Sequence, residues 1–155
     1  MKAQMHDFMD GNGPVPSHIH TKGGGWVADT ANVYDSAYIG PDARVYGNAW
    51  VSGNACVSGD ARVHGNARVY GNARVYGDAL VYGNARVYGN ARVYGDAWVH
   101  DNALVHDNAL VHDDALVHGD ALVYGNALVS GDARVRGDAW VSGSARVYEI
   151  GRAHV

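Results

Sequence analysis

The sequence predicts an all-β solenoid in which a short parallel coil repeats along one axis. The first observation is an unbroken run of twenty hexads over residues 26–145, each ending in Ala, with Val in second position except at Ile39. The second is a longer period of 18 residues, visible in the residue before that Ala. Repetition at a fixed period indicates a solenoid. A period of six excludes an amphipathic helix, because it does not keep one face at 3.6 residues per turn.

Each hexad is typical of one short strand followed by one bend. In residues 68–73 (RVYGNA), Arg and Tyr should point outward and Val inward, because successive side chains of a strand alternate. Gly followed by Asn or Asp suits the bend, since these residues take a positive φ at little energetic cost. Inward Val and Ala would fill a narrow interior, which places function on the outer faces, at the ends or between subunits.

The residue before each Ala sorts the hexads into three columns. One column is entirely Asp: Asp42, Asp60, Asp78, Asp96, Asp114 and Asp132. The second holds Asn48, Asn66, Asn84, Asn102, Asp120 and Asp138, and the third holds Ser36, Asn54, Asn72, Asn90, Asn108, Asn126 and Ser144. Three hexads therefore make one coil of triangular cross-section. Twenty hexads make about seven coils, about 32 Å tall at roughly 4.8 Å per coil.

Residues 38–51 (YIGPDARVYGNAWV) carry an aliphatic residue and a small residue at the spacing of a known repeat. The pattern resembles the hexapeptide-repeat superfamily, including its uncharacterised acyltransferase-like members, over residues 26 to about 151. The resemblance implies a left-handed parallel β-helix, although parallel crossovers are in general right-handed. It also implies a homotrimer with parallel axes.

The chain divides into three parts by pattern. Residues 1–25, which contain GNGPVP and KGGG, are expected to form an N-terminal cap or arm. Residues 26–145 form the β-helix, and residues 146–155 a C-terminal closing segment. Caps protect the strand edges that terminal coils would otherwise expose.

Composition and charge exclude some classes of partner and predict the cellular compartment. The net charge of −4 does not favour duplex DNA, and no apolar run approaches the roughly 20 residues of a membrane span. The first residues lack the apolar core of a signal peptide, and Cys56 has no partner for a disulfide. We expect a cytoplasmic protein with no membrane contact.

Four histidines recur at six-residue intervals in WVHDNALVHDNALVHDDALVHGDA, residues 98–121. The winding predicts that His100, His106 and His112 lie on three different faces, whereas His100 and His118 stack on one face in the column that also contains His64. A zinc ion held by His100 and His118 with Asp101 and Asp120 is one interpretation. The other, which we adopt, is that His replaces Tyr in a surface ladder, so that no metal site is expected.

A second histidine group occurs near the N-terminus. His18 and His20, beside His6, are a separate metal-binding candidate, and the alternative is a mobile or capping segment.

Arg and Tyr recur together one coil apart, which predicts two ligand-binding surfaces. They comprise Arg68, Tyr70, Arg86 and Tyr88 on one face, and Arg74, Tyr76, Arg92 and Tyr94 on the next. Neighbouring guanidinium groups repel, so an anion would relieve them, and Tyr rings stack on bases or sugars. Ordinary cross-strand packing of Arg on Tyr is the alternative.

Beyond these arginines the outward first position becomes apolar. The predicted subunit interface comprises Trp98, Leu104, Leu110, Leu116, Leu122 and Leu128, with Leu80 and Trp140 as outlying members. Dense exposed apolar residues usually mark an interface. Packing of these side chains beneath Tyr and His is the alternative.

The Asp column requires compensation for its repulsion. Arg44, Arg62 and Arg134, turn amides, or calcium ions could supply it, and we favour amide hydrogen bonds. The Asn columns need no ligand, because stacked amides hydrogen-bond one another.

We therefore predict a non-enzymatic trimeric binding module without a cofactor, which presents Arg and Tyr to a small anionic or aromatic ligand, such as a nucleotide or glycan, or to a protein partner. One alternative, implied by the resemblance, is an acyltransferase that uses acyl-coenzyme A and His100 or His118 as an intersubunit general base. The other is a self-assembling structural protein.

Overall fold

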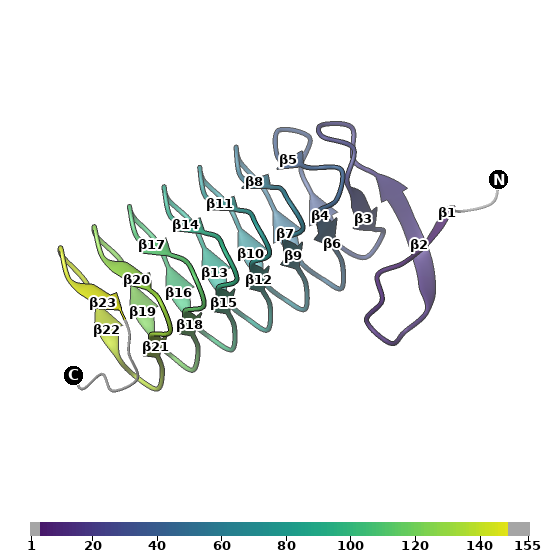
Figure 1. Ribbon diagram of the computed structural model, residues 1–155. Coiled ribbons are helices and arrows are strands. Elements are labelled where there is room, and N and C mark those ends of the chain that lie inside the picture. Colours follow the sequence, from purple (N-terminus) through teal and green to yellow (C-terminus); the bar gives the residue numbers. More distant parts are fainter. Residues whose placement is uncertain (1–3, 149–155) are drawn as a thin grey trace.

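The computed structural model describes residues 4–148, which form stacked parallel coils preceded by an N-terminal hairpin (Figure 1). The described residues are all β with no helix. Strands three positions apart in chain order pair in parallel, as in the register Arg68↔Arg86 and Val69↔Val87. This 18-residue step confirms the predicted β-solenoid of about seven coils. Its left hand stays an expectation from the resemblance.

Three sheets, which we term A, B and C, form the faces of the solenoid. Sheet A contains β1 (Gln4–Asp7), β2 (Pro14–Ile19), β3 (Trp26–Ala28), β6 (Arg44–Val45), β9 (Arg62–Val63), β12 (Leu80–Val81), β15 (Trp98–Val99), β18 (Leu116–Val117) and β21 (Arg134–Val135). Sheet B contains β4 (Asn32–Val33), β7 (Trp50–Val51), β10 (Arg68–Val69), β13 (Arg86–Val87), β16 (Leu104–Val105), β19 (Leu122–Val123) and β22 (Trp140–Val141). Sheet C contains β5 (Tyr38–Ile39), β8 (Cys56–Val57), β11 (Arg74–Val75), β14 (Arg92–Val93), β17 (Leu110–Val111), β20 (Leu128–Ser130) and β23 (Arg146–Tyr148).

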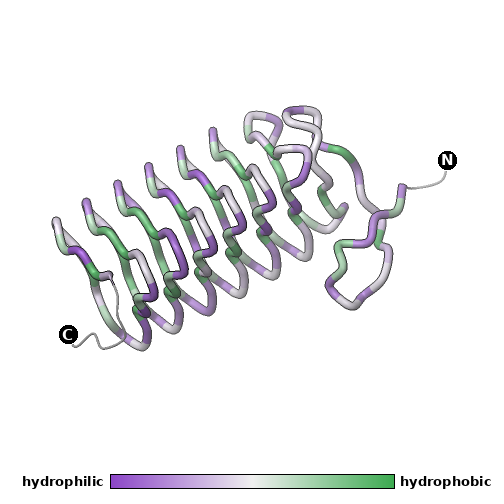
Figure 2. The backbone as a smooth tube through the Cα atoms, viewed as in Figure 1, coloured by the Kyte–Doolittle hydropathy of each residue, from purple (hydrophilic) through white to green (hydrophobic). Residues whose placement is uncertain are grey.

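The core is a column of small aliphatic side chains. The second and last residues of the hexads from Val27 to Val135 are buried and form one cluster, except Val33, which is partly buried and packs against it. Figure 2 shows hydrophobic and hydrophilic residues alternating around the coils. Backbone hydrogen bonds join successive coils, for example from Arg68 N to Ala85 O at 3.0 Å. Each coil therefore completes both the core and the hydrogen bonds of its neighbour.

The bends bring backbones of successive coils into close contact. Gly77 has φ +70°, and a Cβ at this position would lie 2.9 Å from the backbone nitrogen of Gly95. A side chain therefore meets both an unfavourable conformation and a steric clash there.

The N-terminal residues cover the first coil. β1 and β2 form an antiparallel hairpin, and β2 pairs antiparallel with β3, which extends sheet A beyond the coils (Figure 1). Phe8 is 1% exposed and stacks on Tyr46 at 4.8 Å between ring centroids. The loop between β2 and β3 forms two backbone hydrogen bonds with Ile39. Gly25 N donates to Ile39 O, and Ile39 N donates to Lys22 O.

The other end continues the coil further than the pattern suggests. Residues 146–148 form β23 in register with β20, so sheet C extends past the expected boundary at residue 145. The rest of the predicted closing segment, residues 149–155, lies outside the described residues, as do residues 1–3.

Candidate functional site

A groove of about 590 Å³ runs along the outer surface of sheet B, which we term face B. One side is the strand column Trp50, Arg68, Arg86 and Leu104, and the other is the bend column Asn48, Asn66, Asn84 and Asn102. Arg68 and Arg86 are exposed and pair in register on β10 and β13. The guanidinium carbon of Arg68 lies 5.5 Å from the ring centroid of Trp50, a cation–π contact that orients Arg68.

An equivalent groove of about 400 Å³ runs along face C, the outer surface of sheet C. It is lined by Asn72, Arg74, Asn90, Arg92, Asn108 and Leu110. Arg74 and Arg92 pair in register and are exposed. Cys56 precedes Arg74 in this column, where Trp50 precedes Arg68 on face B.

The arginines of both grooves lack acidic partners within residues 4–148. The five ion pairs of this part of the chain all join His to Asp. Arginines that pair in register without carboxylates form a local positive surface on a chain of net charge −4.

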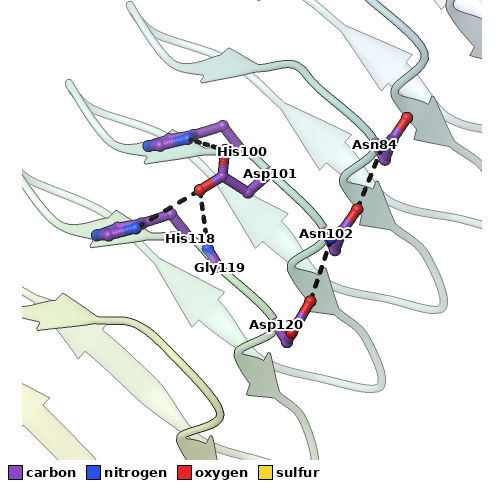
Figure 3. Close-up of polar contacts among 7 residues, drawn as sticks. All are labelled: Asn84, His100, Asp101, Asn102, His118, Gly119 and Asp120. Atoms are coloured by element: carbon purple, nitrogen blue, oxygen red, sulfur yellow. Dashed lines mark hydrogen bonds and ion pairs between the residues drawn. The ribbon is translucent and has the colours of Figure 1, made fainter.

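The Asn columns add neutral hydrogen-bond donors beside the arginines. Asn84 donates to Asn102 Oδ1 at 3.2 Å on face B (Figure 3), and Asn72 donates to Asn90 Oδ1 at 3.4 Å on face C. Each side-chain amide carries two N–H groups, so one remains after the ladder bond. The amide ladders predicted from the sequence are therefore present.

The tyrosines stack with one another beside the grooves. Tyr70 and Tyr88 have ring centroids 4.8 Å apart, as do Tyr76 and Tyr94. Desolvation, followed by the neighbouring Tyr70, raises the pKa of Tyr88.

Both grooves are lined by Arg and Asn together, a combination that the sequence analysis did not predict. The available signal was the Asn two residues before each of these arginines.

The histidines lie as the winding predicts. His100 and His118 stack at 5.0 Å in the sheet A column, which also contains His64 and Tyr82. His106 stacks between Tyr88 and Tyr124 in the sheet B column. His112 stacks on Tyr94 in the sheet C column. These contacts fit the interpretation of His as a ladder residue in the place of Tyr.

The four residues of the zinc interpretation do not converge (Figure 3). The Asp101 carboxylate lies 3.2 Å from His100 Nδ1 and 3.7 Å from His118 Nδ1. Asp120 belongs to the Asn ladder and accepts a hydrogen bond from Asn102 at 3.1 Å. Across residues 4–148, no three His, Cys, Asp or Glu side chains are grouped to hold a metal ion.

Asp101, Asp107 and Asp113 occupy the bend position that Gly takes in most hexads. Their φ angles are 61–62°, in the left-handed region. Each lies 3.2 Å from Nδ1 of the preceding His and accepts a bond from a backbone N–H one coil further along: Gly119, Gly125 and Gly131 respectively. The bond from Gly119 and the contact with His100 lower the pKa of Asp101.

The N-terminal histidines serve separate structural contacts. His18 Nδ1 lies 2.7 Å from Asp29 Oδ1. His20 is buried, and its Nε2 lies 2.8 Å from the carbonyl oxygen of Ala37. His6 stacks on Trp26 at 4.5 Å. These contacts support the capping alternative rather than a shared metal.

Neighbouring carboxylates of the Asp column repel one another. Desolvation, and then the charges of Asp78 and Asp114, raise the pKa of Asp96. Its neighbours one coil away on either side thus disfavour the ionised form of Asp96.

The apolar first positions differ in exposure. Leu104, Leu110, Leu116, Leu122 and Leu128 are all half-buried. Trp98 is 42% exposed and Trp140 68% exposed. Trp98 packs edge-on against Tyr82, and Trp140 packs edge-on against Tyr124. Partial burial and partial exposure therefore coexist in this band.

Comparison with known proteins supports the architecture. A family model described as YdcK Beta solenoid repeat matches residues 43–58, 50–65, 67–83, 85–101 and 121–137. These segments span less than half of the chain and are similar to that repeat. No curated protein and no solved structure matches. The chain is a β-solenoid repeat protein. Residues 4–148 contain no helix long and apolar enough to span a membrane.

Proposed function

We propose that this β-solenoid is a non-enzymatic binding module whose face-B groove holds a small anionic ligand. The observation that carries the proposal is the in-register pair Arg68 and Arg86, which has no acidic partner within residues 4–148. The Asn amides along the opposite side of the groove add hydrogen-bond donors for the ligand.

Electrostatics favours an anion between the two arginines. Two positive charges one coil apart, at about 4.8 Å, repel by about 1 kcal/mol even in a water-like dielectric. An anion that contacts both guanidinium groups removes this repulsion and accepts charge-assisted hydrogen bonds. Phosphate, sulfate and carboxylate groups match the planar fork of Arg. The ligand class is therefore a nucleotide or an acidic glycan.

Trp50 supports this role by restricting Arg68. A guanidinium held over a ring loses less side-chain entropy when a ligand binds. Face C has Cys56 in the equivalent place, so its arginine lacks this support. We expect face B to bind a soluble anion more tightly than face C.

The test is calorimetric titration of ATP and of a heparin-derived tetrasaccharide into the parent chain and into Arg68→Ala/Arg86→Ala. The double variant should bind at least about tenfold more weakly, since one charge-assisted hydrogen bond contributes about 1.5–3 kcal/mol. The matched control is Arg134→Ala/Arg146→Ala, which removes two exposed arginines that pair with Leu116 and Leu128 instead. Equal affinity in the parent and in Arg68→Ala/Arg86→Ala, or equal losses in both variants, would contradict the proposal.

The proposed quaternary structure is a homotrimer with parallel solenoid axes. The half-buried leucines and the exposed Trp98 supply apolar surface for such a contact. Light scattering of the parent chain tests it directly, because a monomeric mass would contradict the trimer.

A second candidate function is acyl transfer from acyl-coenzyme A. The observation in its favour is the contact between His100 Nδ1 and Asp101, because a carboxylate on one ring nitrogen orients the other as a proton acceptor. Acetyl-coenzyme A turnover by the parent chain that is lost in His100→Ala would select this candidate over the binding module.

A further inference from the structure

Two identical hexads, residues 74–79 and 92–97 (RVYGDA), lie one coil apart on sheet C. Each begins with an exposed Arg on face C, Arg74 or Arg92. Each also carries an exposed Asp, Asp78 or Asp96, at the bend that leads into sheet A. A positive pair and a negative pair therefore occur at the same two levels of the solenoid, on neighbouring sides of it.

Neither pair is neutralised within residues 4–148. All five ion pairs of this part involve histidine, so Arg74 and Arg92 have no acidic partner there. The arginines line the open groove of about 400 Å³ on face C. Asp96 remains subject to repulsion from Asp78 and Asp114. The positive surface of the arginines is therefore complementary in charge to the negative surface of the aspartates.

Cyclic symmetry brings the two surfaces to the same height. In a ring of copies with parallel axes, equivalent residues of all copies lie at one level along the axis. The hexad 74–79 of one copy then faces the hexad 74–79 of the next, and residues 92–97 follow one coil away. Both ladders advance by one coil per step, so an Arg74 to Asp78 contact places Arg92 opposite Asp96.

The choice of face follows from closure of the ring. The Asp bend ends the same hexads that begin on face C. The surface with the aspartates and the surface with the arginines therefore lie on adjacent sides of the solenoid. Adjacent sides let a head-to-tail contact close into a small ring, whereas surfaces across the molecule generate an open array. Face B lies across from the Asp bend, because sheets C and A meet at that bend. Face C is therefore the face that receives the Asp bend of the neighbouring copy.

The apolar residues of face C continue the same contact. Leu110 pairs with Arg92 in register, and Leu128 pairs with Leu110. Both leucines are half-buried in the single chain. A neighbouring copy that lies along the arginines would also cover these side chains, which adds a hydrophobic part to the charged one.

We propose that the Asp78 and Asp96 bend of a second copy docks in the face-C groove and pairs with Arg74 and Arg92. The inference rests on the trimer proposed above and specifies which residues form its interface. It leaves the face-B groove open to the soluble ligand.

The experiment measures the mass in solution of the full chain and of charge-reversed variants by light scattering. Arg74→Asp/Arg92→Asp and Asp78→Arg/Asp96→Arg should each reduce the mass from three chains to one, because like charges then meet. The four substitutions combined should restore the trimer, since the two surfaces have exchanged signs. High salt should dissociate the parent, because exposed pairs are screened as the Debye length falls from about 10 Å at 0.1 M to about 3 Å at 1 M.

Two matched controls locate the contact. Arg68→Asp/Arg86→Asp makes the same change on face B and should leave the mass unchanged. Asp132→Arg alters the same Asp column at a level where the hexad begins with Leu128 instead of Arg, and it should also leave the trimer intact. All substituted side chains are exposed, so each variant should keep the fold of the parent. Circular dichroism of each variant checks this.

The outcomes separate this inference from the proposed function. A trimer that survives both face-C reversals, or a quadruple variant that stays monomeric, overturns the inference while the trimer stands. A monomeric parent overturns both of these, yet binding of ATP or tetrasaccharide at Arg68 and Arg86 still tests face B separately. Loss of the trimer in Arg68→Asp/Arg86→Asp would place the contact on face B and also overturn the inference.

Discussion

The Asp101 carboxylate accepts a hydrogen bond from the backbone N–H of Gly119, 3.1 Å away and one coil further along the solenoid. The same carboxylate lies against the imidazole of His100. Asp101 takes a left-handed conformation that most other hexads reserve for Gly. The bond across the coils therefore compensates for a strained backbone position.

We predict that Asp101→Ala lowers the midpoint of thermal unfolding and that Asp101→Gly lowers it less. Alanine loses the bond to Gly119 and keeps the strain, whereas glycine loses the bond and relieves the strain. Calorimetry of the parent and both variants checks the order. Equal midpoints for Asp101→Ala and the parent would show that the bond has no effect on stability.

Gly77→Ala should destabilise the solenoid more than Gly137→Ala. Both positions have positive φ, so both should lose about 1–2 kcal/mol from the left-handed conformation. Only Gly77 also brings the new Cβ within 2.9 Å of Gly95 N, whereas a Cβ at Gly137 meets no atom of residues 4–148 within 4 Å. Urea unfolding of the two variants measures the difference. Similar losses at both positions would mean that the neighbouring coil moves aside freely.

Phe8→Ala should release the N-terminal hairpin from the first coil. Phe8 is almost completely buried against Tyr46, and removal of a buried Phe side chain costs about 3–5 kcal/mol. Hydrogen exchange should accelerate in β1 and β2 while protection of β12 persists. Met5→Ala is the control, because Met5 is 53% exposed and should leave the exchange unchanged. Unaltered exchange in Phe8→Ala would contradict the role of Phe8 in capping.

His118→Tyr should reduce the loss of stability in mild acid. Burial, followed by the charge of His100, lowers the pKa of His118 below its usual 6.5 in the folded chain. The unfolded chain therefore binds this proton more readily, so stability is complete above about pH 6.5 and is lost as the pH falls through the folded pKa. Asp101 opposes this shift, and Arg136 and Arg134 add to it.

The measurement is the difference in unfolding free energy between about pH 8 and about pH 5 for the parent and His118→Tyr. Tyrosine keeps a ring in the ladder, as Tyr82 does two coils earlier. His64, whose pKa burial also lowers, should preserve part of the dependence in the variant. An identical pH dependence in both proteins would exclude His118 as a source of acid sensitivity.

The repeat made the fold predictable. Because the hexad sets the strand and the 18-residue period sets the coil, the neighbours of Arg68, Arg74 and His100 followed from counting. The N-terminal part carries no such period, and the sequence indicated only a cap or arm there. Its antiparallel pairing with β3 depends on long-range contacts such as Phe8 on Tyr46.

The site was predictable in part for the same reason. Register placed each arginine beside its equivalent one coil away, but it did not show which bend column shares its groove. The Asn side of that groove depends on how the bend turns its side chains relative to the strand. Likewise, the dipeptide His106-Asp107 did not disclose that Asp107 would take a left-handed conformation and reach Gly125.

The sequence by itself determined the solenoid, its coil length and the columns of side chains, because a strict period leaves one winding that turns the recurring Val and Ala inward. Only the tertiary structure decided how those columns combine into grooves and bends. Groove shape and bend contacts depend on side-chain directions and on backbone atoms from adjacent coils, which spacing along the chain does not specify. For that reason Asp120 shares a residue column with Asn102 but no site with His118.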